Sequence, residues 1–306
     1  MTHDPQAIRR LVARGRQWDK AFAIFGLLCM MIGVMTLAVL LAGLIQDGAA
    51  RLDWSFFHNF PSRRPERAGI ISAIVGSSLV MLITAVSAIP LGIAAGVYLE
   101  EYAARNWLTE IIEINVTNLA GVPSIIYGLL ALGLFVYAFD FGQSILSAGL
   151  TLALMILPVI IVSTREAIRA IPGAIREGAY ALGATRWQMV RDHILPYSTG
   201  GILTGVIIGL ARAIGETAPI ITIGALTFIA FLPPSPVSTE FPFLSFEWMR
   251  SPFTVMPIQM FNWLSRPQAA FQENAAAAGI VLVVMTLMMN GVAIWLRLRF
   301  RKRIKW

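Results

Sequence analysis

The chain has 306 residues, of which 57% are hydrophobic and only 13% are charged. Soluble domains carry about 25% charged residues, so this composition excludes an ordinary soluble enzyme and indicates an all-α integral membrane protein. The net charge of +7 is therefore attributed to Lys and Arg retained on one side of a membrane, and we expect no nucleic-acid partner.

Apolar segments of about 20 residues are long enough to cross a lipid bilayer. The sequence predicts six of them, at 21–45, 69–99, 112–138, 144–164, 198–231 and 276–296. The first follows a basic tail over 1–20 and is too long for the apolar core of a signal peptide, so we expect a retained, peripheral membrane helix. Prolines inside predicted spans indicate kinks, at Pro90, Pro123, Pro158 and Pro219.

The distribution of basic residues predicts the orientation of the chain. With both termini in the cytoplasm, seventeen of the 24 Lys and Arg residues lie on the cytoplasmic side, including the basic tail at 297–306, and six lie outside. The opposite orientation would reverse this bias, which contradicts the positive-inside rule. We therefore predict cytoplasmic termini, a periplasmic loop at 46–68 and a cytoplasmic segment at 165–196.

The segment 165–196 is far longer than a turn between two membrane helices requires. Apolar residues recur at helical spacing on both sides of Gly183. They are Ile175, Ala179 and Leu182 before it, and Trp187, Val190 and Ile194 after it. Glycine suits a turn with positive φ. We predict two short helices around a glycine turn, held in the cytoplasm by another protein; the alternative is a hairpin lying on the membrane surface.

Arg212 and Glu216 are charged residues inside the fifth predicted span. Ionisable groups at membrane depth are costly and usually face a cavity or a partner. The two residues stand one helical turn apart and are expected to pair, with a break in the span at Gly215 and Pro219. The pair either lines a translocation pathway, where arginine suits an oxyanion, or is a buried ion pair that only fixes helix packing.

Motifs for catalysis or metal binding are not found. The chain has no G-x-x-x-x-G-K-[ST] segment, no H-E-x-x-H segment and a single cysteine, Cys29. His3, His58 and His193 lie far apart in the predicted topology, so no metal site is expected. Without these motifs the chain cannot hydrolyse a nucleotide through a phosphate-binding loop by itself, and it is predicted to be a non-enzymatic membrane protein that binds no cofactor.

The segment 165–196 is similar to the EAA motif of type I ABC importer permeases. The matching residues are Glu177, Gly178, Ala179, Gly183, Leu195 and Pro196. Gly178 replaces the usual alanine and His193 the usual isoleucine. The strings FPSRRPERAGI (60–70), LAGVPSIIYGL (119–129) and LARAIGETAP (210–219) resemble, more narrowly, the phosphate-specific permease subunits of the PstA family.

The resemblance implies a six-helix, MetI-like permease domain over 69–296 that imports inorganic phosphate by alternating access. The implied partners are a second permease (PstC-like), an ATPase dimer (PstB-like) and a periplasmic phosphate-binding protein (PstS-like). The chain would be a transport subunit whose ATP and Mg²⁺ are held by the ATPase. The EAA residues would couple to that ATPase, and Arg212 and Glu216 would act in phosphate passage. The alternatives are the partner permease itself, a permease for another oxyanion, or a self-contained secondary transporter. The last would need midplane carboxylates and often shows inverted repeats, which are not seen here.

Overall fold

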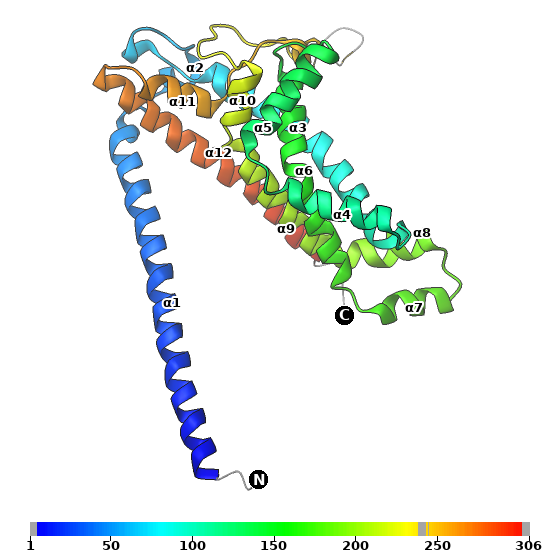
Figure 1. The fold of residues 1–306 in the computed structure, drawn as a ribbon. Coiled ribbons are helices and arrows are strands. Elements are labelled where there is room, and N and C mark those ends of the chain that lie inside the picture. Colours follow the sequence, from blue (N-terminus) through cyan, green and yellow to red (C-terminus); the bar gives the residue numbers. More distant parts are fainter. Residues whose placement is uncertain (1–4, 238–242, 244, 302–306) are drawn as a thin grey trace.

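The computed structural model describes residues 5–237, 243 and 245–301, and in these the regular structure is helical (Figure 1). The principal helices, in chain order, are α1 (Pro5–Gly48), α2 (Trp54–His58), α3 (Ile71–Val97), α4 (Trp107–Leu119), α5 (Ser124–Ala131), α6 (Ile145–Arg169), α7 (Gly173–Ala181), α8 (Arg186–Met189), α9 (Leu195–Ile214), α10 (Ala218–Ile223), α11 (Met256–Leu264) and α12 (Ala269–Arg301). Short π-helical turns extend α3 (Tyr98–Tyr102), α5 (Leu132–Ala138) and α8 (Val190–Ile194), and 3₁₀ turns occupy Ala49–Arg51, Pro65–Arg67 and Glu247–Arg250.

Five described helical segments are long and apolar enough to cross a membrane, and a bent helix pair makes a sixth candidate. The five are Gly15–Arg51, Ile71–Tyr102, Ile145–Arg169, Arg186–Ile214 and Ala269–Arg299. The all-helical fold with six candidate spans, expected from the apolar segments, is therefore confirmed. The predicted domain boundaries stay a prediction.

The third predicted span is not one kinked helix. α4 and α5 meet at an angle of 109°, and residues 120–123 between them are not helical. Pro123 explains the break, because proline disfavours a helical conformation in the residue before it and lacks an N–H donor. The hydroxyl of Tyr127 donates a hydrogen bond to the carbonyl of Leu119 at 2.7 Å, which fixes the bend. By contrast, α3 and α6 continue through Pro90 and Pro158.

The fifth predicted span breaks at Gly215, as expected. α9 ends at Ile214, and α10 begins at Ala218 with Pro219 in its first turn, where the missing N–H costs nothing. α10 ends at Ile223 and is capped by Gly224, whose φ of +98° suits glycine. This span was predicted to extend to residue 231, but its helical part stops earlier, because the residues after Gly224 are not helical.

The core lies where α3, α6 and α9 pack together. Two glycines let α3 and α6 approach closely: a Cβ atom on Gly92 would lie 2.6 Å from Ile160 Cγ2, and one on Gly149 would lie 2.5 Å from Ile83 Cβ. The hydroxyl of Thr84 adds a polar contact, 3.1 Å from the carbonyl oxygen of Gly149. Because close packing makes an interior stiff, α3 and α6 form one rigid unit.

α1 leaves the rest of the molecule (Figure 1). Only its C-terminal end is packed, with Gly48 against Ala277 and Leu44 against Gly279 of α12, while its apolar side chains from Trp18 to Leu40 are mostly exposed. α1 begins and α12 ends on the side of the molecule that carries α7 and α8, and α2 and α11 lie on the opposite side. The side with α7 and α8 is called the knob end, and the side with α2 and α11 is called the loop end.

Candidate functional site

The knob, residues 173–194, is a compact helix–turn–helix. Its turn is made by Gly183, whose φ is +82° and whose N–H donates to the carbonyl of Tyr180 at 2.9 Å. Thr185 then begins α8 with a capping box: its hydroxyl accepts from Gln188 N–H, and the Gln188 side chain accepts from Thr185 N–H. The expected short helix before Gly183 and the glycine turn are confirmed. The helix after the turn is not short, because α8 continues through the π turn into α9 as one helical segment, Arg186–Ile214.

Only part of the predicted apolar stripe is buried. Ala179, Val190 and Ile194 lie in a buried cluster that also includes Met189, whereas Leu182 is 89% exposed and Trp187 58% exposed. The uneven burial of the stripe has a geometric reason. α7 ends before Leu182, and the π turn after Met189 changes the 3.6-residue period on which the stripe was based. The knob therefore has a packed inner face and uncovered apolar side chains.

The residues matching the EAA motif occupy different positions on the knob. Glu177 and Gly178 are exposed on α7, and a Cβ atom on Gly178 would meet open space. Ala179 is buried, and Gly183 makes the turn. Leu195 and Pro196 begin α9, directly after the π turn. The motif thus combines an exposed carboxylate with residues that shape the backbone.

An ion-pair network at the base of the knob was missed by the sequence reasoning. The residues are Glu100 and Glu101 in the π turn after α3, Glu113 of α4, Arg165 and Arg169 of α6, and Arg176 of α7. Nitrogen–oxygen distances are 2.7 Å for Arg165–Glu113, 3.0 Å for Arg169–Glu100 and 2.7 Å for Arg176–Glu101. The prediction of orientation counted only basic residues, so the acidic partners in this network were overlooked. The adjacent carboxylates at 100–101, on the side predicted to carry five arginines in 165–196, were the available signal.

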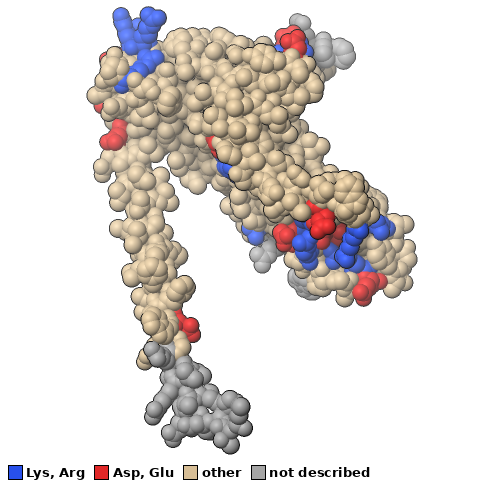
Figure 2. All heavy atoms as spheres, in the orientation of Figure 1, with Lys and Arg blue, Asp and Glu red and all other residues tan. Residues whose placement is uncertain are grey.

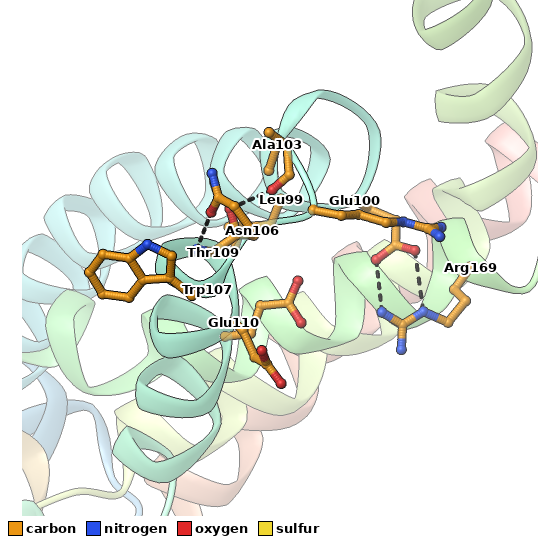
Figure 3. A pocket seen from close by; sticks show the side chains of 11 residues that line it. Leu99, Glu100, Ala103, Asn106, Trp107, Thr109, Glu110 and Arg169 are labelled. Carbon is orange, nitrogen blue, oxygen red and sulfur yellow. Dashed lines mark hydrogen bonds and ion pairs between the residues drawn. The ribbon is translucent and has the colours of Figure 1, made fainter.

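A hollow of about 670 Å³ lies beside this network, between the π turn after α3 and the start of α4 (Figure 3). Glu100, Glu110 and Glu113 line it together with Arg105 and Arg169. Figure 3 shows the Glu100–Arg169 pair at one side of the hollow and Trp107 at the other. The knob end therefore carries both acidic and basic side chains, and most of them pair with one another within the chain.

Arg212 and Glu216 do not pair with one another. No nitrogen–oxygen contact within 4.0 Å joins them, although both residues are described. The predicted pairing was wrong because α9 ends at Ile214, which removes the shared helix face. Arg212 is exposed in the last turn of α9, within electrostatic reach of Tyr127 on α5. Glu216 is half-buried and lines a small pocket with Ser77.

Charge is concentrated at the two ends of the molecule. In Figure 2, blue and red atoms gather over the knob end and along the loop end, and the surface between them is nearly uncharged. An uncharged middle is the surface that a bilayer requires. No three described His, Cys, Asp or Glu residues lie close enough together to hold a metal ion.

Comparison with known proteins gives consistent matches. Residues 88–306 match the family described as binding-protein-dependent transport system inner membrane component. The chain is 30% identical to the phosphate transport system permease protein PstA of Yersinia pestis, over 93% of this chain and 91% of that protein. It is also 30% identical to the probable ABC transporter permease protein YqgI of Bacillus subtilis, over 93% and 96%.

Two solved structures have a similar fold. One is a bacterial ABC transporter that imports the acidic polysaccharide alginate, with a TM-score of 0.61, 16% identity and coverage of 93% of this chain and 99% of that chain. The other is the MetNI methionine ABC transporter in an inward-facing conformation, with a TM-score of 0.58, 17% identity and coverage of 76% and 97%.

Proposed function

Because the chain belongs to the family of binding-protein-dependent transport system inner membrane components, we propose that it is the membrane-spanning permease subunit of an ATP-driven phosphate importer. The evidence for phosphate as the substrate is the similarity to named relatives: a protein named as a phosphate permease matches 93% of this chain at 30% identity. The exposed guanidinium of Arg212, beside the break between α4 and α5, suits an oxyanion.

The proposed orientation places the knob end and both termini in the cytoplasm of a cell with an inner membrane. Basic residues outnumber acidic ones in the segments assigned to this side, in line with the positive-inside rule. The loop end then faces the periplasm, where a PstS-like phosphate-binding protein would deliver the substrate.

The knob is proposed to dock onto a PstB-like ATPase dimer. Leu182, Trp187 and Tyr180 are apolar side chains left uncovered on a segment that is otherwise well packed. Glu177 is exposed on α7 and has no ion pair among the described residues. Apolar anchors surrounded by charge are typical of a protein interface. ATP and its Mg²⁺ would be bound by that partner, because this sequence has no phosphate-binding loop of its own.

A PstC-like second permease is proposed to cover the face that this chain leaves open. α4 has no buried residue, although its sequence is apolar over much of its length. Arg212 is exposed nearby, so a pathway built on this face would be completed by the partner.

Reconstitution tests the proposal. The chain is placed in vesicles with candidate PstC-, PstB- and PstS-like partners, and the import of phosphate and of sulfate is measured with and without ATP. We expect ATP-dependent import of phosphate in preference to sulfate, and none from the chain alone. Uptake by the chain alone without ATP would establish a secondary transporter, and a preference for sulfate would assign another oxyanion.

A further inference from the structure

Arg176 connects three elements at the base of the knob. Its guanidinium donates two hydrogen bonds to Glu101, from Nη2 at 2.7 Å and from Nε at 3.0 Å. It also donates to the carbonyls of Ile168 and Ile171, at 3.1 and 2.9 Å. These carbonyls belong to the last turn of α6 and the turn after it, and the Ile168 carbonyl also accepts a hydrogen bond from the Ile171 N–H at 3.1 Å. One side chain therefore fixes α7 relative to α6 and to the end of α3.

The pair with Arg176 explains the buried position of Glu101. Its side chain is 7% exposed, and Arg176 is its ion-pair partner among the described residues. A buried carboxylate is costly unless it is paired. The π turn directs the neighbouring Glu100 to Arg165 and Arg169 on α6, while Glu101 reaches α7. Two adjacent carboxylates thus hold two successive elements in place.

Apolar packing alone would not fix the orientation of the knob. Tyr102 packs against the buried cluster under the knob, and the Arg186 guanidinium lies 5.7 Å from its ring centroid. Apolar contacts have no preferred direction, so they permit sliding and rotation. Charge-assisted hydrogen bonds do have a direction, and the four bonds of Arg176 select one orientation of α7. The contacts of Arg176 with Glu101 and with the end of α6 lie at one end of the closely packed helices α3 and α6.

We propose that Glu101 and Arg176 are positioning residues for energy coupling, through which a displacement of the knob is passed to α3. The proposal rests on the proposed function, because it requires a partner ATPase that moves the knob. Without the pair the knob still docks, but α7 rotates on the turn at 170–172, and part of each displacement is lost before it reaches α3.

The number of ATP molecules hydrolysed for each phosphate imported tests this proposal in the reconstituted complex. In Glu101→Gln and in Arg176→Gln we expect normal assembly and ATP hydrolysis, with this ratio raised about tenfold. The double variant should be no worse than either single variant, because the two residues act through one contact. Arg176→Lys keeps the charge and should recover much of the loss.

Arg169→Gln is the matched control. It removes an arginine that is also paired with a carboxylate of the π turn, but the Arg169 side chain is 53% exposed, so the pair is screened by solvent. The ratio should change less than about twofold. If neither glutamine variant exceeds this control, the proposal is wrong. Where a glutamine variant does not assemble, Glu101→Asp, which shortens the reach of the carboxylate, replaces it under the same criterion.

A distance measurement separates this proposal from the proposed function. Spin labels at Arg105→Cys and Ala174→Cys, in a Cys29→Ala background, report the distance between α7 and the loop that follows the π turn of α3, and they do so without transport. We expect one narrow distribution in the parent protein and a broad one in the glutamine variants. Unchanged distributions would overturn the positioning role, whereas a parent complex that imports no phosphate would count only against the proposed function.

Discussion

The knob and the region around Arg212 use arginine in different ways. At the base of the knob, Arg165 and Arg176 are paired with carboxylates of the same chain, over distances of 2.7 Å. Arg212, at membrane depth, is exposed and has no ion pair among the described residues. The charges at the base of the knob are therefore paired within this chain. Because an unpaired charge in a membrane is costly, Arg212 requires a substrate or a partner.

This difference separates two tasks within one subunit. A surface that receives force must keep its shape, and internal pairing provides that rigidity. A surface that lets an ion pass must not bind it too tightly, and an arginine without a fixed carboxylate leaves its donors free for a transient ligand. The four predictions that follow test the two regions, beginning with the largest expected effect.

Gly183→Pro should abolish ATP-dependent phosphate uptake. Proline holds φ near −65°, whereas Gly183 has a φ of +82°, and the change also removes the N–H that donates to Tyr180. The measurement is uptake by the reconstituted complex. Gly291→Ala on α12 is the control, because a Cβ atom there meets open space, and it should keep normal uptake. A Gly183→Pro complex that still couples hydrolysis to uptake would show that the turn is dispensable.

Arg212→Ala should lower phosphate uptake about 10- to 100-fold, the cost of losing a charge-assisted hydrogen bond to the anion. ATP hydrolysis should persist, because the knob is untouched. Initial rates with phosphate and with sulfate measure both activity and selectivity, and Arg250→Ala, which removes an exposed arginine at the loop end, is the control. Full rate and selectivity in both Arg212→Ala and Glu216→Gln would remove these residues from the pathway.

Arg165→Gln should lower the free energy of unfolding by about 2–4 kcal/mol, because it leaves Glu113 and Glu100 without their shared, largely buried partner. Denaturant titration in detergent measures the change. Arg191→Gln breaks an exposed pair with Asp192 and should have no measurable effect. Equal stability of the two variants would mean that the network at the knob does not stabilise the fold.

Asp53, at the loop end, should give the smallest effect, below about 1 kcal/mol. The Ser55 hydroxyl, the Phe56 N–H and Arg51 hold the pKa of its carboxyl below the ordinary value of 3.8. A lowered pKa in the folded state adds stability above pH 3.8 that is lost as the pH falls through the folded pKa. Unfolding measured from about pH 6 to about pH 2 should show this loss in the parent and less of it in Asp53→Asn.

The sequence predicted the knob well because its signals are local. The length of the polar segment, the glycine and the helical spacing all act within a few residues of one another. Periodicity did not tell which residues of the stripe pack inside the chain: Leu182 and Trp187 are exposed, because this segment contains a turn and a π turn. The pairing of Arg212 with Glu216 was mispredicted because the break expected at Gly215 separates them: α9 ends at Ile214, two residues before Glu216, so the two residues share no helix face.

That this chain is helical, that it belongs in a membrane and that one polar knob is exposed at one end can be inferred from composition, segment length and local turn chemistry. Which charges meet depends on the tertiary structure. Glu101 reaches Arg176 across 75 positions of sequence. That contact exists because α3 and α6 pack closely through small residues and end together at the knob, an alignment that no local pattern encodes.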